Sequence, residues 1–341
     1  MSGTVPPRQP PAIGPLGDEQ VSRVLGLVDS ATVADGVAPL SEATMLHIRH
    51  DTDSAGHADV VVGNARGYAH LDDPGSEGDF SGELVVDPAS RRRGYGRELL
   101  DALTRLAGGR GPRIWAHGDL PAAAALARSA GFTRVRALWQ MRRPLAGPRG
   151  RVTLPPGVTL RSFVPGKDED AWLEVNGRAF AKHPEQGSWT LEDLRLREAE
   201  PWFDPDGFIL AERDGHLAGF HWTKVHPGSV GEVYVVGVDP AEQGSGLGRA
   251  LTLAGLEYLA SRNLDQVMLY VDEDNQSAVR MYASLGFSRW STDVMYAPAR
   301  GDRQRDLTPN GRTRRASSRA PGPVRCGSAA PRSPPRRPAH R

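Results

Sequence analysis

Cysteine is nearly absent from this sequence. The sequence also lacks an apolar stretch that could span a membrane and an N-terminal signal-peptide pattern. The single cysteine among 341 residues, Cys326, excludes a disulfide framework within the chain and argues against a cysteine acyl-enzyme. No apolar stretch is long enough to cross a bilayer, and the N-terminus lacks a basic segment followed by an apolar run. We therefore expect a cytoplasmic protein without a membrane partner, in which any acyl transfer is direct.

Negative charge is scarce at one end of the chain and in excess elsewhere. The formal net charge is +1, but residues 300–341 contain 12 arginines, 2 aspartates and no lysine, which leaves the rest of the chain acidic. The arginines of this tail are not interleaved with aromatic residues, so we expect no nucleic-acid partner. The Pro, Arg and Ser content of the tail and the Pro/Gly content of residues 1–17 predict disordered extensions.

Glycine, by contrast, is concentrated in a loop around which the chain is organised. The β-branched stretch Glu232–Asp239 ends at Pro240, and it is followed by Gln243-Gly244-Ser245-Gly246-Leu247-Gly248 and an apolar helical run. Such a loop lets several backbone N–H groups converge on a phosphate. A P-loop is excluded because Arg249 and Ala250 replace its Lys and Ser/Thr, and the glycine spacing excludes the dinucleotide-binding fingerprint.

The same arrangement occurs earlier in the chain. Glu83–Pro88 precedes Arg91–Gly96, and both loops are followed by a strand, a helical stretch and a Gly-Phe pair. The offset is 152 residues from Arg91 to Gln243, and 155 residues between the pairs that begin at Gly131 and Gly286. We infer a tandem repeat of one domain-sized unit. The shared pattern, Gln/Arg-x-x-Gly-x-Gly/Ala, resembles the pyrophosphate loop of the GCN5-related N-acetyltransferases, which use acetyl-CoA.

Apolar periodicity and turn residues predict alternating helices and strands in each unit. This order is typical of an α/β fold in which a mixed, mostly antiparallel sheet is flanked by helices. We expect an N-terminal domain at 18–146, a Pro/Gly-rich linker at 147–156 and a C-terminal domain at 157–298, between disordered segments at 1–17 and 299–341. The expected helices are 18–33, one from Ser41, 168–180, 190–200, 246–261 and 276–285, and the expected strands include 58–62, 67–71, 135–142, 158–161, 208–212, 218–225, 266–271 and 289–296.

Two residues are candidates for the proton transfers that an acetyl transfer from acetyl-CoA would need. Acyl transfer from a thioester to an amine requires the amine to lose a proton and favours protonation of the leaving thiolate. Glu232, on the strand before the loop, is a candidate base, and Tyr282, in the last helical stretch, is a candidate acid. In the first unit, Phe80 lies 152 residues before Glu232 and Ala127 lies 155 residues before Tyr282, so these two residues occupy the equivalent positions. We therefore expect the C-terminal unit to be the catalyst and the N-terminal unit to be non-catalytic.

A closer likeness is carried by six segments: Asp35–Pro39, Trp115–Gly118, Gln140–Leu145, His183–Gly187, Gly219–Pro227 and Gly231–Pro240. In this order they resemble the mycothiol synthase family of tandem GCN5-related N-acetyltransferases, over roughly residues 18–297. The resemblance implies that acetyl-CoA acetylates the cysteine amine of a cysteinyl-glucosaminyl-inositol acceptor.

The resemblance also implies roles for individual residues. Glu232 is implied as a base that acts through a water, and Tyr282 as the acid. The implied contacts of the acceptor are Glu42, Glu185, Lys224, Glu232 and Tyr270. The implied acetyl-CoA contacts of the C-terminal unit are Val236, Gly237, Val238, Gln243, Gly244, Ser245, Gly246, Leu247, Gly248, Arg249, Asn275, Gln276, Ser277, Ala278, Val279 and Arg280. Those of the N-terminal unit are Leu84, Val85, Val86, Arg92, Arg93, Gly94, Tyr95, Gly96 and Arg97.

Two other functions remain open. The chain can be an acetyltransferase of another small amine or of a protein N-terminus, or a regulatory module that binds acetyl-CoA without turnover. We expect no metal, because His221 and His226 lie five residues apart on an expected strand and so face opposite sides of it. We expect a monomer, because two units in one chain can replace the two subunits of a dimer.

Overall fold

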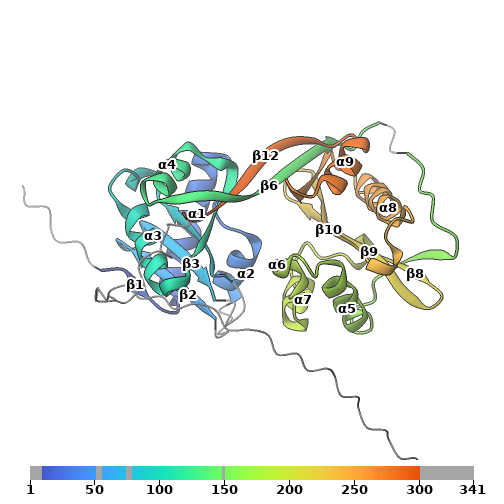
Figure 1. Cartoon of the computed structure of the whole chain (residues 1–341), viewed down its shortest axis with the longest axis horizontal. Coiled ribbons are helices and arrows are strands. Elements are labelled where there is room, and N and C mark those ends of the chain that lie inside the picture. The colour runs from blue at the N-terminus through green and yellow to red at the C-terminus, as the bar shows by residue number, and fades with distance from the viewer. Residues whose placement is uncertain (1–9, 51–55, 74–78, 148–149, 300–341) are drawn as a thin grey trace, which may run out of the picture. The chain divides into compact units, whose positions relative to one another are not determined.

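Helices and strands alternate along two successive halves of the chain in the computed structural model, which describes residues 10–50, 56–73, 79–147 and 150–299 (Figure 1). Of the segments expected to be disordered, 1–17 and 299–341, residues 1–9 and 300–341 lie outside the described residues. The elements of the first half are β1 (Ala12–Ile13), α1 (Asp18–Asp35), α2 (Glu42–His50), β2 (His57–Val62), β3 (Gly67–Asp72), β4 (Ser81–Val86), α3 (Tyr95–Leu106), β5 (Arg113–Ala116), α4 (Pro121–Ser129) and β6 (Phe132–Pro144). Those of the second half are β7 (Val158–Ser162), α5 (Glu169–Ala179), α6 (Pro184–Gly187), α7 (Leu191–Glu198), β8 (Phe208–Arg213), β9 (His216–His226), β10 (Val230–Val238), α8 (Leu247–Ser261), β11 (Gln266–Asp272), α9 (Gln276–Ser284) and β12 (Ser288–Pro298).

Among the described residues, twelve strands form one continuous sheet. Their order is β1-β2-β3-β4-β5-β12-β6-β11-β10-β9-β8-β7. The pairs β4–β5 and β10–β11 are parallel, and the other neighbouring pairs are antiparallel. The expected mixed, mostly antiparallel sheet flanked by helices is thus confirmed.

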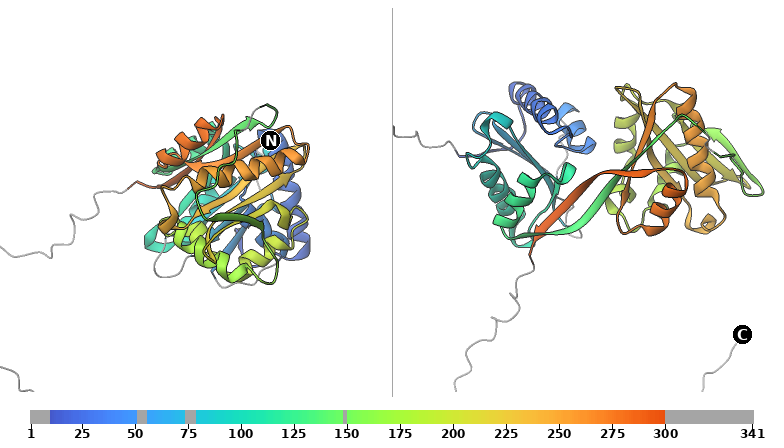
Figure 2. Two further views of the ribbon diagram at one scale, coloured as in Figure 1. Left: turned by 90° about the vertical axis from the view of Figure 1, so that its right-hand side faces the viewer. Right: turned by 90° about the horizontal axis from the view of Figure 1, so that it is seen from above.

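The last strand of each half completes the sheet of the other half. β6 pairs with β11 of the second half, β12 pairs with β5 of the first, and the two strands pair with each other (Figures 1 and 2, green and orange). Val294 and Tyr296 of β12 are accordingly buried in the first hydrophobic core, and Met141 of β6 in the second. The two halves, although consecutive in sequence, therefore exchange core residues.

Helices cover both faces of the sheet because successive side chains of a strand point to opposite faces. On β9, Phe220 and Trp222 join the aromatic core beneath α5, whereas the intervening His221 contacts α8 at Leu251. On β3, Tyr68 packs in the cluster that includes α1, and Ala69 packs in the cluster that includes α3. Each half is thus a three-layer arrangement of helices around sheet.

Three elements differ from the sequence-based expectation, and one of them is α6 (Pro184–Gly187), a short helix where the sequence analysis lists none. β1 lies within residues 1–17, whose composition predicts disorder, because Ile13 pairs with Val60 at the outer edge of β2 and the ladder offsets the loss of chain freedom. β6 begins at Phe132, earlier than the expected residue 135, since Phe132 pairs with Pro298 of the distant strand β12. Within the described residues, no helix is long and apolar enough to cross a membrane.

Candidate functional site

Strand β10 has a free backbone edge in the second half. It pairs with β11 only from Val230 to Val233, although its pairing with β9 continues to Val238. The register with β9 shifts between Val233 and Val235, and such a bulge increases the local twist. Amide groups from Val235 to Val238 therefore lack a partner strand on one side, among the described residues. An extended ligand that carries amides can pair there as an added strand does.

The glycine loop provides an anion site beside this edge. Gly244 and Gly246 have φ values of 80° and 88°, in the left-handed region that side chains disfavour, and α8 starts at the next residue, Leu247. In the first half, Arg92 and Gly94 adopt φ values of 61° and 89° before α3. Both loops thus combine left-handed backbone positions with a following helix N-terminus, an arrangement that can bind a phosphate through backbone N–H groups.

Glu232 lies on β10, on the face of the sheet that it shares with Lys224. The two residues are direct cross-strand partners, and the side chain of Glu232 is 8% exposed. Its Oε2 atom accepts a hydrogen bond of 2.6 Å from Nε2 of His226. One carboxylate oxygen is therefore oriented by an imidazole, and the other has no hydrogen-bond partner among the residues that the structure describes, which leaves it available to a substrate.

Tyr282 lies on α9 and is 8% exposed. Its ring packs edge-on against Phe287 at a centroid distance of 5.8 Å. Burial raises the pKa of Tyr282 to about 12, so the phenol stays protonated at neutral pH. No residue within the described part of the chain hydrogen-bonds its hydroxyl, which leaves this proton available.

Glu42 brings the first half into contact with this face of the second half. It forms an ion pair with Lys224, and its Oε2 accepts a hydrogen bond of 2.6 Å from the hydroxyl of Tyr234. Arg197 donates to the same hydroxyl at 2.9 Å, and Nζ of Lys224 lies 4.3 Å from the ring centroid of Trp202. The structure therefore brings together Glu42 and Lys224, which the sequence analysis expects at one site. Tyr234 and Arg197 join them there.

Tyr270 and Glu185 are also expected to contact the acceptor, and the structure describes the side chain of only the first. The hydroxyl of Tyr270 accepts a hydrogen bond of 2.8 Å from Gln140 of β6, whose side chain in turn accepts one of 2.9 Å from Arg142. The exchanged strand thus supplies support for Tyr270. Glu185 lies in α6, and its side chain is outside the part of the chain that the structure describes.

The remaining expected acetyl-CoA contacts of the second half lie on the loop and on α9. Asn275 caps α9 by accepting a hydrogen bond of 3.1 Å from the amide of Ala278. Arg249 and Arg280 are exposed, and Arg249 donates to Ser284 at 2.9 Å. The cap holds the N-terminal turn of α9, and Arg249, which directly follows the loop, leaves positive charge beside it.

In the first half, a cavity of about 640 Å³ lies beside β4 and the loop before α3, which correspond to β10 and the glycine loop of the second half. β4 pairs with β5 only at Ser81 and Gly82, so beyond them this edge of β4 has no partner strand in the described parts of the chain. The lining contains eight of the nine residues expected to contact acetyl-CoA there, all except Arg93, namely Leu84, Val85, Val86, Arg92, Gly94, Tyr95, Gly96 and Arg97.

A buried charged network beside this cavity was not expected from the sequence. His117, which lines the cavity, hydrogen-bonds Glu83 and Asp293 at 3.0 Å each. Glu83 also accepts hydrogen bonds from the amide of Ser41 at 2.8 Å and the hydroxyl of Thr44 at 2.9 Å. The network therefore links β12 to the start of α2, next to Glu42. The sequence has no signal for it, because its members come from four distant segments.

The charge of His117 predicts that stability falls at alkaline pH. Burial alone lowers the pKa of an imidazole, but the hydrogen bonds to Asp293 and Glu83 raise that of His117 to about 10. This group therefore contributes stability that is complete below its unfolded pKa of about 6.5 and is lost as pH rises through about 10. Urea-unfolding midpoints from pH 6.5 to 9.5 should fall more steeply for wild type than for His117→Gln. Parallel curves would show that His117 is neutral in the folded protein.

Hydrogen bonding of Glu232 by His226 is another feature that the sequence analysis missed. The signal for it is the Pro227-Gly228 turn, because a hairpin closed there places His226 diagonally across from Glu232.

Two family models match the chain. One is described as "Acetyltransferase (GNAT) family" and matches residues 172–287; the other is described as "Acetyltransferase (GNAT) domain" and matches residues 50–134. Among solved structures, a tandem GNAT protein from the clavulanic acid biosynthesis pathway has a TM-score of 0.66 and 23% identity, over 86% of this chain and 100% of that one. A GCN5-related N-acetyltransferase from Sphaerobacter thermophilus has a TM-score of 0.61 and 23% identity, over 84% and 95%. At this identity the two structures show the fold alone.

Curated relatives are more similar. The mycothiol acetyltransferase of Thermomonospora curvata is 62% identical over 283 residues, which cover 82% of this chain and 94% of the relative. That of Thermobispora bispora is 59% identical over 290 residues, which cover 82% and 96%. With identity this high over nearly the whole length of the relatives, the chain belongs to the mycothiol acetyltransferase family of tandem GNAT enzymes.

Proposed function

We propose that the protein transfers the acetyl group of acetyl-CoA to the cysteine amine of 1D-myo-inositol 2-(L-cysteinylamino)-2-deoxy-α-D-glucopyranoside, giving mycothiol and CoA. The observation that carries this proposal is the position of Glu232, a buried carboxylate on the strand whose free edge adjoins the glycine loop. The names of the relatives support the choice of acceptor. The free edge from Val235 to Val238 and the loop at Gly244 and Gly246 fit the amides and the pyrophosphate of acetyl-CoA.

The proposed chemistry uses two residues of the second half. The amine nitrogen attacks the acetyl carbon, its proton passes to Glu232 directly or through a water, and the C–S bond breaks. An α-amine has an unperturbed pKa of about 8, so a carboxylate suffices as base near neutral pH. Tyr282, whose phenol stays protonated at this pH, gives its proton to the leaving sulfur. We propose that His226 orients the carboxylate of Glu232 through their 2.6 Å hydrogen bond.

The acceptor is proposed to bind among the polar residues on this face of β9, β10 and β11. Glu42, Lys224 and Tyr270 offer acceptors and donors for sugar and inositol hydroxyls, and Glu185 is proposed to join them. Lys224 and Glu42 pair with each other in this structure, so an acceptor that binds to both must replace that ion pair. A polyhydroxylated amine can do so, whereas an apolar amine cannot.

The first half is proposed to bind acetyl-CoA without catalysing transfer. Its cavity and its loop fit the same ligand. Phe80, at the position of Glu232, is buried and apolar, and Ala127, at the position of Tyr282, has no hydroxyl. We further propose that the protein acts as a cytoplasmic monomer.

The first experiment measures CoA release from acetyl-CoA with the cysteinyl-glucosaminyl-inositol amine as acceptor. Wild type should turn over, and kcat of Tyr282→Phe should fall by about two orders of magnitude or more because the acid is lost. Tyr258→Phe is the matched control: it removes a phenol hydroxyl that bonds Asp204 at 2.6 Å, away from the proposed site, and should keep kcat within about threefold. Turnover with another amine but not with this acceptor would reject the substrate assignment. No turnover with any amine, in a protein that binds acetyl-CoA, would favour the regulatory module.

A further inference from the structure

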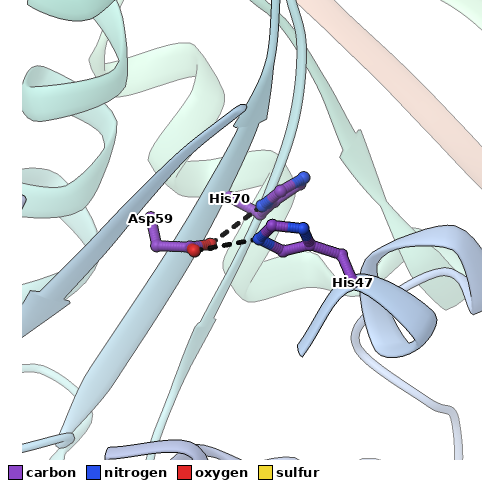
Figure 3. A group of neighbouring side chains, drawn as sticks. All are labelled: His47, Asp59 and His70. Carbon is purple, nitrogen blue, oxygen red and sulfur yellow. Dashed lines mark hydrogen bonds and ion pairs between the residues drawn. The ribbon is translucent and has the colours of Figure 1, made fainter. Parts of the chain in front are cut away.

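Three histidines and two aspartates cluster on the first half, away from both glycine loops. Figure 3 shows three of them, His47 from α2, Asp59 from β2 and His70 from β3. Nε2 of His47 lies 3.0 Å from Oδ2 of Asp59, and Nδ1 of His70 lies 2.9 Å from Oδ1 of the same carboxylate. Asp59 and His70 are direct cross-strand partners, so their side chains share one face of a rigid pair of strands.

The donor set and its spacing suit a transition-metal ion. The two imidazole nitrogens and a carboxylate oxygen all lie within 4.8 Å of one another. Ligands of a tetrahedral Zn²⁺ ion, at bond lengths of 2.0 to 2.2 Å, are separated by about 3.3 Å. Each imidazole nitrogen lies a few tenths of an ångström nearer than this to one oxygen of the Asp59 carboxylate, so small side-chain adjustments would admit an ion. Two imidazoles with one carboxylate and an open fourth position are a usual ligand set for Zn²⁺.

Two neighbouring residues, Asp72 and Tyr68, form hydrogen bonds with the proposed ligands and orient them for metal binding. With Nδ1 of His70 on the ion, its Nε2–H donates to Oδ1 of Asp72 at 3.1 Å, an arrangement typical of metal-bound histidines. The hydroxyl of Tyr68 donates to Oδ1 of Asp59 at 2.6 Å, which leaves Oδ2 for the ion. With neutral imidazoles, Asp59 and Asp72 together carry the two negative charges that a divalent cation neutralises.

A second set of three ligands is less suitable. His57, His70 and Asp72 also lie within 4.8 Å of one another, but the side chains of His57 and Asp72 are 30% and 46% exposed. Those of His47, Asp59 and His70 are 15%, 6% and 2% exposed. We propose that His47, Asp59 and His70 form a binding site for a divalent transition-metal ion of the Zn²⁺ type.

Such an ion would tie the last turn of α2 to the sheet. Because α2 begins at Glu42, the ion would also hold the residue that pairs with Lys224. This consequence for acceptor binding rests on the proposed function, whereas metal binding does not. The expectation that the protein has no metal site considered only His221 and His226, which lie on a different strand.

The test is a titration of the full-length, chelator-treated protein with Zn²⁺ by calorimetry, and with Co²⁺ by visible absorption. One equivalent should bind with a Kd in the micromolar range or below, the Co²⁺ complex should show the intense bands of tetrahedral coordination, and the melting temperature should rise with Zn²⁺. His47→Gln and Asp59→Asn should each weaken binding by at least tenfold and abolish the Co²⁺ bands. Mg²⁺, which prefers six oxygen ligands, should not bind.

His216→Gln is the matched control, because it removes an exposed histidine from the start of β9 and should leave Zn²⁺ binding unchanged. His47 lies at the rim of the cluster, so His47→Gln decides the question if Asp59→Asn fails to fold. Absence of stoichiometric binding, or binding that His47→Gln leaves intact, would show that the cluster is only an ion-paired hydrogen-bond network. Because binding is measured without either substrate, this outcome is independent of acetyl transfer.

Discussion

Replacing Glu232 by glutamine is expected to lower kcat/KM for acetyl transfer by two to four orders of magnitude, the range typical of a lost general base. Glutamine has nearly the shape of glutamate and can still pair with His226, but it cannot take a proton from the amine. Steady-state CoA release at saturating acetyl-CoA measures the effect.

The control for this substitution is Glu257→Gln, which changes an exposed carboxylate on α8 by the same chemistry and should leave kcat/KM within about threefold of wild type. The affinity for acetyl-CoA, measured by calorimetry, should be similar in all three proteins, since the loop and the free edge of β10 are untouched. A Glu232→Gln enzyme that keeps more than a tenth of wild-type activity would remove this residue from the role of base.

Replacing Gly255 by alanine is expected to reduce the free energy of unfolding by about 3 kcal/mol or more, the upper end of the cost of overpacking. A Cβ atom at this position of α8 would lie 2.0 Å from Cε1 of His221, which is fully buried and whose Nδ1 hydrogen-bonds the carbonyl of Leu251 at 2.7 Å. The ring cannot move without losing that hydrogen bond or separating α8 from β9. This clash outweighs the roughly 1 kcal/mol by which alanine is preferred to glycine within a helix.

Gly26→Ala in α1 is the matched control, because a Cβ there meets nothing within 4 Å. It should stabilise the protein by about 0.5–1 kcal/mol through helix propensity alone. Urea unfolding of wild type and both variants gives the comparison. A Gly255→Ala protein as stable as Gly26→Ala would mean that His221 and α8 are not in close contact.

The features that the sequence predicted correctly are those set by neighbouring residues. Pro240 ends the strand before the loop, and the left-handed conformations of Gly244 and Gly246 follow from residue type. The expected strand at 266–271 corresponds to β11 at Gln266–Asp272, because a run of β-branched and apolar residues is a local signal. The roles of Glu232 and Tyr282 stay predictions, although the structure gives both the burial that they require.

The sequence by itself thus determined the repeated unit, the two glycine loops and the difference between Glu232 and its counterpart Phe80. Only the tertiary structure decided that β6 and β12 exchange places, and it alone joined His117 to Glu83 and Asp293. It also assembled His47, Asp59 and His70. The physical reason is that a backbone ladder can form between any two strands, so the choice of partner depends on which side chains can be buried together in the complete fold.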